Sequence, residues 1–92
     1  MIYYVYVLSN KKHTVFYTGV TNDIVRRVHE HKDRKNHSFT SRYNCYQLLY
    51  FEEYSSIMEA IAREKELKKF PREWKFQLIS RMNPEWIDLS GD

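Results

Sequence analysis

Two short runs of β-branched and aromatic residues open the chain, with a polar Ser-Asn-Lys-Lys-His turn between them. The runs at 2–8 and 14–20 have the composition of strands, and the turn joins them closely enough for a hairpin. Tyr4, Tyr6 and Leu8 share one face of the first run, and the residues between them are also apolar. The pattern predicts a β-hairpin whose first strand is covered on both faces.

The next periodic segment follows a Thr-Asn-Asp cluster that is typical of a helix start. We expect a helix over residues 23–32 with Asn22 as its N-cap. The residues that share one stripe of this helix, at i, i+3, i+4 and i+7, are Ile24, Arg27, Val28 and His31. Because Arg27 and His31 lie among apolar positions, the stripe indicates a cationic pocket rather than a solvated face.

The second half of the chain begins with a polar link at residues 33–42, which has no glycine or proline. A link of that length in so small a domain is often functional. Residues 45–52 have strand composition, with Leu48 and Tyr50 on one face and the intervening apolar residues on the other. The pattern leaves the neighbour of this third strand in the sheet open.

A helix is expected after Ser56, which forms a capping box with Glu59. Its expected inner stripe consists of Ile57, Ala60, Ile61 and Leu67. Glu64 falls on the same stripe, and burying an acid alone costs several kcal/mol, so Glu64 must be paired, solvated through a cleft or bound to a metal. Pro71, at the first helical position, then starts a helix that ends near Met82.

Length and composition favour one small globular domain. The chain has 92 residues, of which 42% are hydrophobic and 16% aromatic, enough for one modest core. We expect a single domain over residues 1–82, followed by a C-terminal tail over residues 83–92 in which Pro84, Trp86 and Leu89 are possible docking points.

The charge balance mildly favours polyanionic partners, because 15 Lys and Arg against 12 Asp and Glu give a formal net charge of +3. The positive charge is concentrated in one segment. Its basic residues are Arg26, Arg27, Lys32, Arg34, Lys35 and Arg42, against the acids Glu30 and Asp33. This segment can contact phosphates, and it is equally consistent with an ordinary solvated loop.

Targeting and redox signals are few. A single cysteine, Cys45, excludes an intrachain disulfide and a cysteine-based zinc site. The first residues lack a basic leader and a cleavage site, and no apolar run approaches the roughly 20 residues of a membrane span. We therefore expect a cytoplasmic protein that does not enter a membrane.

The chain resembles the GIY-YIG nuclease superfamily over about residues 2–70. The matching features are the two tripeptides Tyr-Val-Tyr at 4–6 and Tyr-Thr-Gly at 17–19, an arginine within Arg-Arg-Val-x-x-His, and Glu64 in a later helix. The resemblance implies a three-stranded antiparallel sheet flanked by helices, in the order β-β-α-β-α-α. It is closest to the small single-domain bacterial members.

The resemblance also implies the roles of five residues. Tyr6 and Tyr17 would supply two active-site phenols, and Arg27 would contact the scissile phosphate. His31 stands where relatives have His or Tyr, and Glu64 would hold a divalent cation, Mg²⁺ or Mn²⁺. A fixed guanidinium and a hard metal ion suit phosphodiester hydrolysis because both stabilise charge on the phosphate oxygens. Tyr17, favoured over Tyr6, would act as base or orient the water.

Two departures from the family pattern affect this assignment. Tyr4 replaces the first glycine of the family name, so close backbone approach is either not needed there or is achieved in another way. Val20 stands where some relatives place a lysine that lowers the pKa of the tyrosine, which weakens the case for Tyr17 as a base. Arg27 is preferred over Arg26 because it shares the apolar stripe, whereas Arg26 points toward solvent or the DNA backbone.

Each of these residues also has a purely structural interpretation. Tyr6 and Tyr17 can be packing residues, and Arg27 with Glu64 can form an ion pair between two helices. His31 can be a hydrogen-bonded histidine at a helix end.

Three functional classes follow from these alternatives. The first is a metal-dependent DNA endonuclease, with RNA not excluded as a substrate and a protein partner or homodimer possible for paired cuts. The second is a catalytically weak or silent nucleic-acid-binding module of the same fold. The third is a structural interaction domain without affinity for DNA, which salt-dependent binding would exclude.

Overall fold

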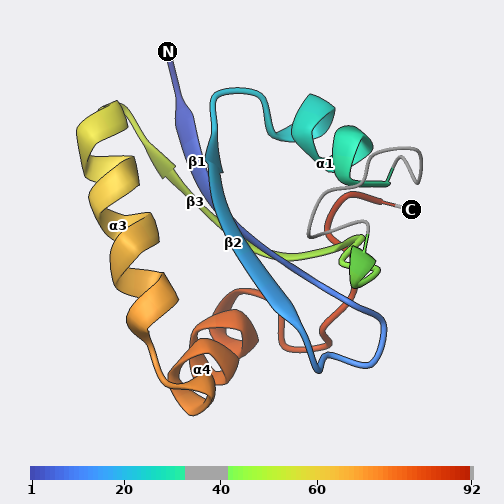
Figure 1. Ribbon diagram of the computed structural model, residues 1–92. Helices are drawn as coiled ribbons and strands as arrows, with labels where there is room; N and C mark the ends of the chain where they lie inside the picture. Colours follow the sequence, from blue (N-terminus) through green and yellow to red (C-terminus); the bar gives the residue numbers. More distant parts are fainter. Residues whose placement is uncertain (33–41, 92) are drawn as a thin grey trace.

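A three-stranded antiparallel sheet lies at the centre of the computed structural model, which describes residues 1–32 and 42–91 (Figure 1). The elements are β1 (Tyr3–Ser9), β2 (Phe16–Thr21), α1 (Ile24–Lys32), β3 (Gln47–Tyr54), α3 (Ile57–Lys69) and α4 (Arg72–Met82). The strand order is β2-β1-β3, so β2 is an edge strand and β1 is central. The expected α+β class and element order are confirmed. Within the described ranges, no helix has the length and apolar character that crossing a membrane requires.

Helices cover both faces of the sheet, as the apolar alternation of β1 predicts. On one face Val5 and Val7 pack with buried residues of α3 and α4, and on the other face Tyr6 and Leu8 pack with Val28 of α1. Figure 1 shows α1 and α3 on either side of β2. A side chain on β1 or β2 therefore belongs to the α1 face or to the α3 face, according to its parity.

A β-bulge in β3 changes which residues share a face. Val7 pairs with Tyr50 and Leu8 pairs with Leu48, so Leu49 is an extra residue between them. Leu49 and Tyr50 both join the core under α3, whereas Leu48 joins the core under α1. The expectation that Leu48 and Tyr50 share a face is wrong, because strict alternation does not hold across a bulge.

Two helix starts differ by one residue from the sequence expectation. Asp23, not Asn22, caps α1, since its carboxylate accepts from the Arg26 N–H at 3.2 Å. The Asp23 N–H in turn donates to the Thr21 hydroxyl at 3.1 Å. Pro71 occupies the N-cap position of α4 rather than the first helical position.

The inner stripe of α3 is narrower than the sequence pattern predicts. Ser56 caps the helix as expected, accepting from the Glu59 N–H at 3.3 Å, and Ala60 and Leu67 are fully buried. Ile57 and Ile61 were expected on the inner stripe, but they are 41% and 40% exposed.

The buried face of α3 instead follows the stripe that runs from Ala60 to Leu67. Arg63 and Glu64 lie on this stripe, and both are half-buried. Arg63 is held there by an ion pair with Glu52 of β3, at 2.9 Å between Nε and Oε1. Glu52 also accepts from the hydroxyls of Tyr50 and Tyr54. This network fixes the rotation of α3 against β3, and it explains why the isoleucines lie at the rim.

The segment after α4 packs back onto the domain. The buried Asn83 amide donates to the Leu49 carbonyl at 3.2 Å, and the Leu89 N–H donates to the Leu48 carbonyl at 2.7 Å. Asp88 accepts from the Leu48 N–H at 3.1 Å. These bonds tie the segment to β3 at several points.

Candidate active site

Tyr6 lies at the centre of the α1 face and is 1% exposed. Its strand partner in the register is Gly19 of β2. A Cβ at Gly19 would lie 2.5 Å from the Tyr6 hydroxyl oxygen and 2.7 Å from Cζ, which is well inside normal contact distance. The Tyr6 ring therefore crosses β2 directly over the glycine, and Gly19 is required there by space.

The Tyr6 hydroxyl connects a histidine and an arginine of α1. It lies 3.0 Å from His31 Nε2, and it accepts from Arg27 Nε at 3.4 Å. Burial raises the pKa of Tyr6 to about 12. Burial, followed by the charge of Arg27, lowers the pKa of His31 to about 4. At neutral pH both groups are uncharged, and the network is satisfied when the Tyr6 hydroxyl donates to a His31 protonated on Nδ1.

Tyr17 and Arg27 form the outer layer of the cluster. The Tyr17 ring lies 6.2 Å from the Tyr6 ring and 5.2 Å from the His31 ring, and its side chain is half-buried. The Arg27 side chain is 41% exposed and pairs with Glu30 at 3.2 Å. The hydrogen bond to Tyr6 is the largest reason why the pKa of Arg27 is raised. The structure thus brings together four of the five residues predicted as catalytic: Tyr6, Tyr17, Arg27 and His31.

A shallow hollow of about 330 Å³ lies beside this cluster at the edge of the sheet. Its lining residues are Tyr3, Val20, Thr21, Asn22, Arg26, Arg27 and Ile57. The guanidinium of Arg27 is therefore presented both to a buried phenol and to an open surface. A guanidinium in that position can bind a phosphate oxygen through charge-assisted hydrogen bonds.

Glu64, the fifth predicted residue, lies on α3 and has a side chain that is 15% exposed. One carboxylate oxygen pairs with Lys68 Nζ at 2.6 Å. Glu64 is two turns after Ile57, which lines the hollow, so both lie on the same side of the helix. In the described part of the chain the ion-pair partner of Arg27 is Glu30, so the alternative of an Arg27–Glu64 structural pair is wrong.

Some of the residues predicted to contact DNA are exposed, and one is instead paired within the protein. Arg26 is largely exposed beside the hollow, where it pairs with Glu30 at 3.3 Å. Arg42 is exposed. Lys32 binds Asp88 at 3.3 Å and the Ser90 hydroxyl at 2.8 Å, so its ammonium anchors the C-terminal segment. The predicted contacts Arg34 and Lys35 lie outside the described residues.

Cys45 is buried just before β3, and burial raises the pKa of its thiol. Across residues 1–32 and 42–91, no three His, Cys, Asp or Glu side chains gather closely enough to hold a metal ion among themselves.

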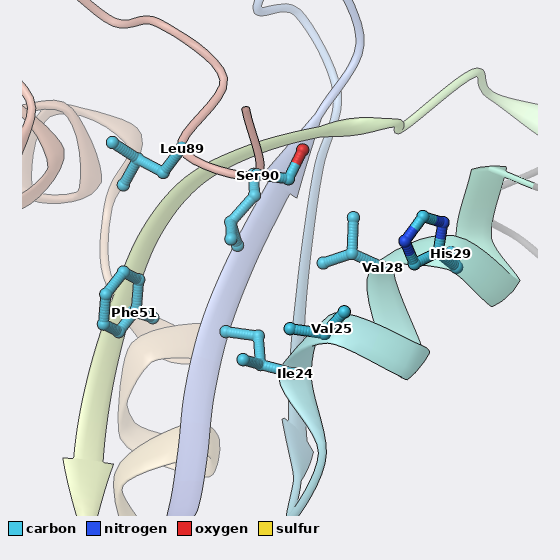
Figure 2. A pocket seen from close by; sticks show the side chains of 8 residues that line it. Ile24, Val25, Val28, His29, Phe51, Leu89 and Ser90 are labelled. Atoms are coloured by element: carbon cyan, nitrogen blue, oxygen red, sulfur yellow. The ribbon is translucent and has the colours of Figure 1, made fainter. Parts of the chain in front are cut away.

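A second pocket lies on the opposite side of α1, between that helix, β3 and the C-terminal segment (Figure 2). It measures about 240 Å³ and is lined mainly by apolar side chains, including Ile24, Val28, Phe51 and Leu89. Figure 2 shows these side chains converging on the space, with the imidazole of His29 at its rim. Because its lining has no arginine or lysine, this pocket is unsuited to a phosphate, and the cationic hollow remains the candidate site.

Sequence reasoning missed the Glu52–Arg63 network beside the site. Tyr50, Glu52 and Tyr54 recur at every second position of β3, so they share one face of the strand. An acid between two tyrosines on a covered face indicates a partnered carboxylate, and this signal was readable in the sequence.

The fold and the site together define a small α+β domain in which an arginine, a phenol and a buried phenol–imidazole pair lie close together near an open hollow at the sheet edge. The chain belongs to the GIY-YIG family, whose model, described as the GIY-YIG catalytic domain, matches residues 2–77. This match confirms the resemblance seen in the two tripeptides. Members of this superfamily are generally nucleases.

Relatives of similar length share this family. The chain is 37% identical over 76 residues to the UPF0213 protein HQ_3675A of Haloquadratum walsbyi, covering 83% of this chain and 84% of that protein. It is 35% identical over 78 residues to the UPF0213 protein SSP2268 of Staphylococcus saprophyticus, covering 85% and 94%. The solution NMR structure of the UPF0213 protein BH0048 from Bacillus halodurans has a TM-score of 0.59 and 32% identity, with coverage of 94% and 90%.

Proposed function

We propose that this protein is a metal-dependent endonuclease that hydrolyses DNA phosphodiester bonds by direct attack of water. The observation that carries the proposal is the Arg27 guanidinium, which is held by the buried Tyr6 hydroxyl and faces a hollow at the edge of the sheet. A cation fixed in this way stabilises the negative charge that develops on the phosphate oxygens, without having to reorganise during the reaction.

The surface residues and the buried residues of the cluster have different proposed roles. Arg27 and Tyr17 reach the surface, so we assign them to the phosphate and to the attacking water. Tyr6 and His31 are buried and uncharged at neutral pH, so we assign them to positioning Arg27 and the Tyr17 ring. With its pKa raised to about 12, Tyr6 is a poor base, which supports Tyr17 as the phenol that receives or orients the water.

Glu64 fits a divalent cation that has few protein ligands. Lys68 occupies one of its carboxylate oxygens, and the other has no protein partner among the described residues. Mg²⁺ usually keeps several waters and takes ligands from substrate phosphates, so a single carboxylate is a suitable donor set. When bound, Mg²⁺ or Mn²⁺ would supply Lewis-acid stabilisation of the phosphate. We expect weak metal binding without DNA.

Two exposed arginines support a nucleic-acid substrate. Arg26 lies at the rim of the hollow and Arg42 is exposed, so we assign both to backbone contacts that position DNA without reading its sequence. We extend the same assignment to Arg34 and Lys35 from their place in the basic segment, and we place the activity in the cytoplasm.

The test is cleavage of supercoiled plasmid, branched DNA, single-stranded DNA and RNA in the presence of Mg²⁺ or Mn²⁺. We expect the wild type to cut at least one DNA substrate and Arg27→Ala and Glu64→Ala to lose that activity. Cleavage that survives either substitution would contradict the assigned site. Salt-sensitive binding without any cleavage would favour the alternative, a binding module of the same fold.

A further inference from the structure

A cluster of aromatic rings and cations lies on the α3 side of the sheet, where β2 and α4 begin. We call it the α4 patch, and its members are Phe16, Arg72, Lys75, Phe76 and Trp86. Its three rings lie close together, with centroids 5.7 Å apart for Phe16 and Phe76, 5.3 Å for Phe76 and Trp86, and 6.4 Å for Phe16 and Trp86. Figure 1 shows α4 beside the start of β2.

The two cations of the patch lie one turn apart on α4. The Arg72 guanidinium lies 5.6 Å from the ring centroids of both Phe16 and Phe76, and it donates to the Thr14 carbonyl at 2.6 Å. The residues Thr14, Phe16, Arg72 and Lys75 line a hollow of about 230 Å³. Within residues 1–32 and 42–91, neither Arg72 nor Lys75 forms an ion pair with a carboxylate. Two positive charges are thus held at one hollow without a counter-charge.

The electrostatic setting of this hollow favours an anion. Burial, and then the charge of Arg72, lowers the pKa of Lys75. Both cations also lie near the N-terminus of α4, where the helix dipole is positive and cations are disfavoured. Pro71, at the N-cap position, provides no side-chain acceptor. A phosphate in the hollow would offset the repulsion between Arg72 and Lys75 and the unfavourable effect of the helix dipole on both cations. It would also supply acceptors at a helix start that has no side-chain cap.

The position of the patch relative to the candidate active site indicates that the anion is a phosphate of a nucleic-acid strand. Phe16 and Tyr17 are neighbours in the edge strand β2, so they point to opposite faces of the sheet. Tyr17 belongs to the candidate active site and Phe16 to the α4 patch. A nucleic-acid strand that passes around the edge of β2 can therefore contact both surfaces within a short distance.

We propose that the α4 patch binds unpaired nucleotides of a nucleic-acid strand, with a phosphate at Arg72 and Lys75 and a base against the exposed Phe76 ring and the half-buried rings beside it. Aromatic rings beside cations suit a single strand, whose bases are free to stack, better than a duplex, whose bases are already paired. The continuation of this strand into the candidate active site rests on the proposed nuclease function. Binding at the α4 patch does not depend on that function.

The first experiment measures binding without metal. A fluorescein-labelled oligothymidylate of about 12 nucleotides is titrated with protein in EDTA, and anisotropy gives the affinity. We expect Lys75→Gln and Arg72→Gln each to weaken binding roughly tenfold at low salt and to lower the salt slope by about 0.7. Arg81→Gln removes an exposed charge from the far end of the same helix and should change the affinity less than twofold.

The second experiment reports on the patch directly. In a Trp74→Phe background, Trp86 is the remaining tryptophan, and a base stacked on the patch should quench its fluorescence. The oligothymidylate should quench, and a duplex of the same length should not. Arg72 also holds the Thr14 carbonyl, so thermal unfolding of Arg72→Gln is measured alongside, and Lys75→Gln carries the test if Arg72→Gln is unstable.

The outcomes separate this inference from the proposed function. Quenching that is lost in Lys75→Gln supports the patch even if no substrate is ever cleaved. Cleavage by the wild type, together with Trp86 fluorescence in the Trp74→Phe protein that the oligonucleotide leaves unchanged, overturns the patch and leaves the nuclease intact. Equal weakening by Arg81→Gln and Lys75→Gln also overturns it, because the effect would then be one of net charge.

Discussion

Gly19→Ala is the substitution whose effect the site geometry determines most closely. The new methyl group would lie 2.5 Å from the Tyr6 hydroxyl oxygen, 2.7 Å from Tyr6 Cζ and 3.1 Å from Tyr17 Cε1. Heavy atoms in good contact are about 3.5–4.0 Å apart, so the Tyr6 ring would have to move by about 1 Å. The ring is anchored by its hydroxyl to His31 and Arg27, and a shift of that size breaks or lengthens both hydrogen bonds.

The cost follows from these contacts. Overpacking a buried site typically costs about 1–3 kcal/mol. Hydrogen bonds lost in the interior add about 1 kcal/mol each, while replacing a glycine recovers about 0.4–1 kcal/mol from the unfolded chain. We expect Gly19→Ala to lower the free energy of unfolding by about 3 kcal/mol. For a domain of this size, that lowers the melting temperature by roughly 15–20 °C.

Urea denaturation of a double-mutant cycle tests this reasoning. Tyr6→Phe removes the closest atom and releases the ring from its anchors, so Gly19→Ala should cost less in the Tyr6→Phe background than in the wild type. Gly91→Ala is the comparison for a methyl group without a clash: nothing lies within 4 Å of a Cβ at Gly91, so its cost comes from the positive φ of 86° alone and should not change in the Tyr6→Phe background. Additive effects of Gly19→Ala and Tyr6→Phe would refute the claim that the tyrosine ring occupies the space above Gly19.

Three further predictions concern groups around the site. Since the pKa of His31 is lowered from 6.5 to about 4, its contribution of about 3 kcal/mol is present above pH 6.5 and is lost as the pH falls toward 4. Urea denaturation of His31→Gln should therefore show a deficit that shrinks over this range, and a deficit independent of pH would contradict the assignment. Glu52→Gln should destabilise the fold by about 3 kcal/mol, because Arg63 loses its buried partner, and thermal unfolding unchanged from wild type would refute this. Asp88→Asn should speed hydrogen exchange at the Leu89 amide, and unchanged exchange would show that Asp88 does not anchor the segment.

Local sequence patterns predicted the elements of the fold because each pattern has a direct physical cause. The alternation of apolar residues in β1 gave both covered faces, and Ser56 gave the start of α3. The bulge at Leu49 was not predictable, because the extra residue is defined only by its pairing with β1. The helical pattern wrongly placed Ile57 and Ile61 on the inner stripe. The rotation of α3 is set by the ion pair between Arg63 and Glu52 of β3, which the pattern of the helix alone does not contain.

The site was predictable where it lies on one local element and less so where it depends on tertiary contacts. The stripe of α1 placed Arg27 and His31 together, and the resemblance carried by the two tripeptides selected Tyr6 and Tyr17. The pairing of Tyr6 with Gly19 is seen only in the register of the sheet. The use of Lys32 as an anchor for the C-terminal segment was hidden, because Asp88 is distant in the sequence. The α4 patch was equally hidden, since it joins residues from β2, α4 and the C-terminal segment.

The most direct test of the proposed nuclease is the single-turnover cleavage rate of Glu64→Gln on whichever DNA substrate the wild type cuts. Glu59→Gln, an exposed acid on the same helix, is the matched control. We predict that Glu64→Gln loses about 100-fold or more in rate while Glu59→Gln remains close to wild type. Equal rates for Glu64→Gln and the wild type would contradict the assigned catalytic site.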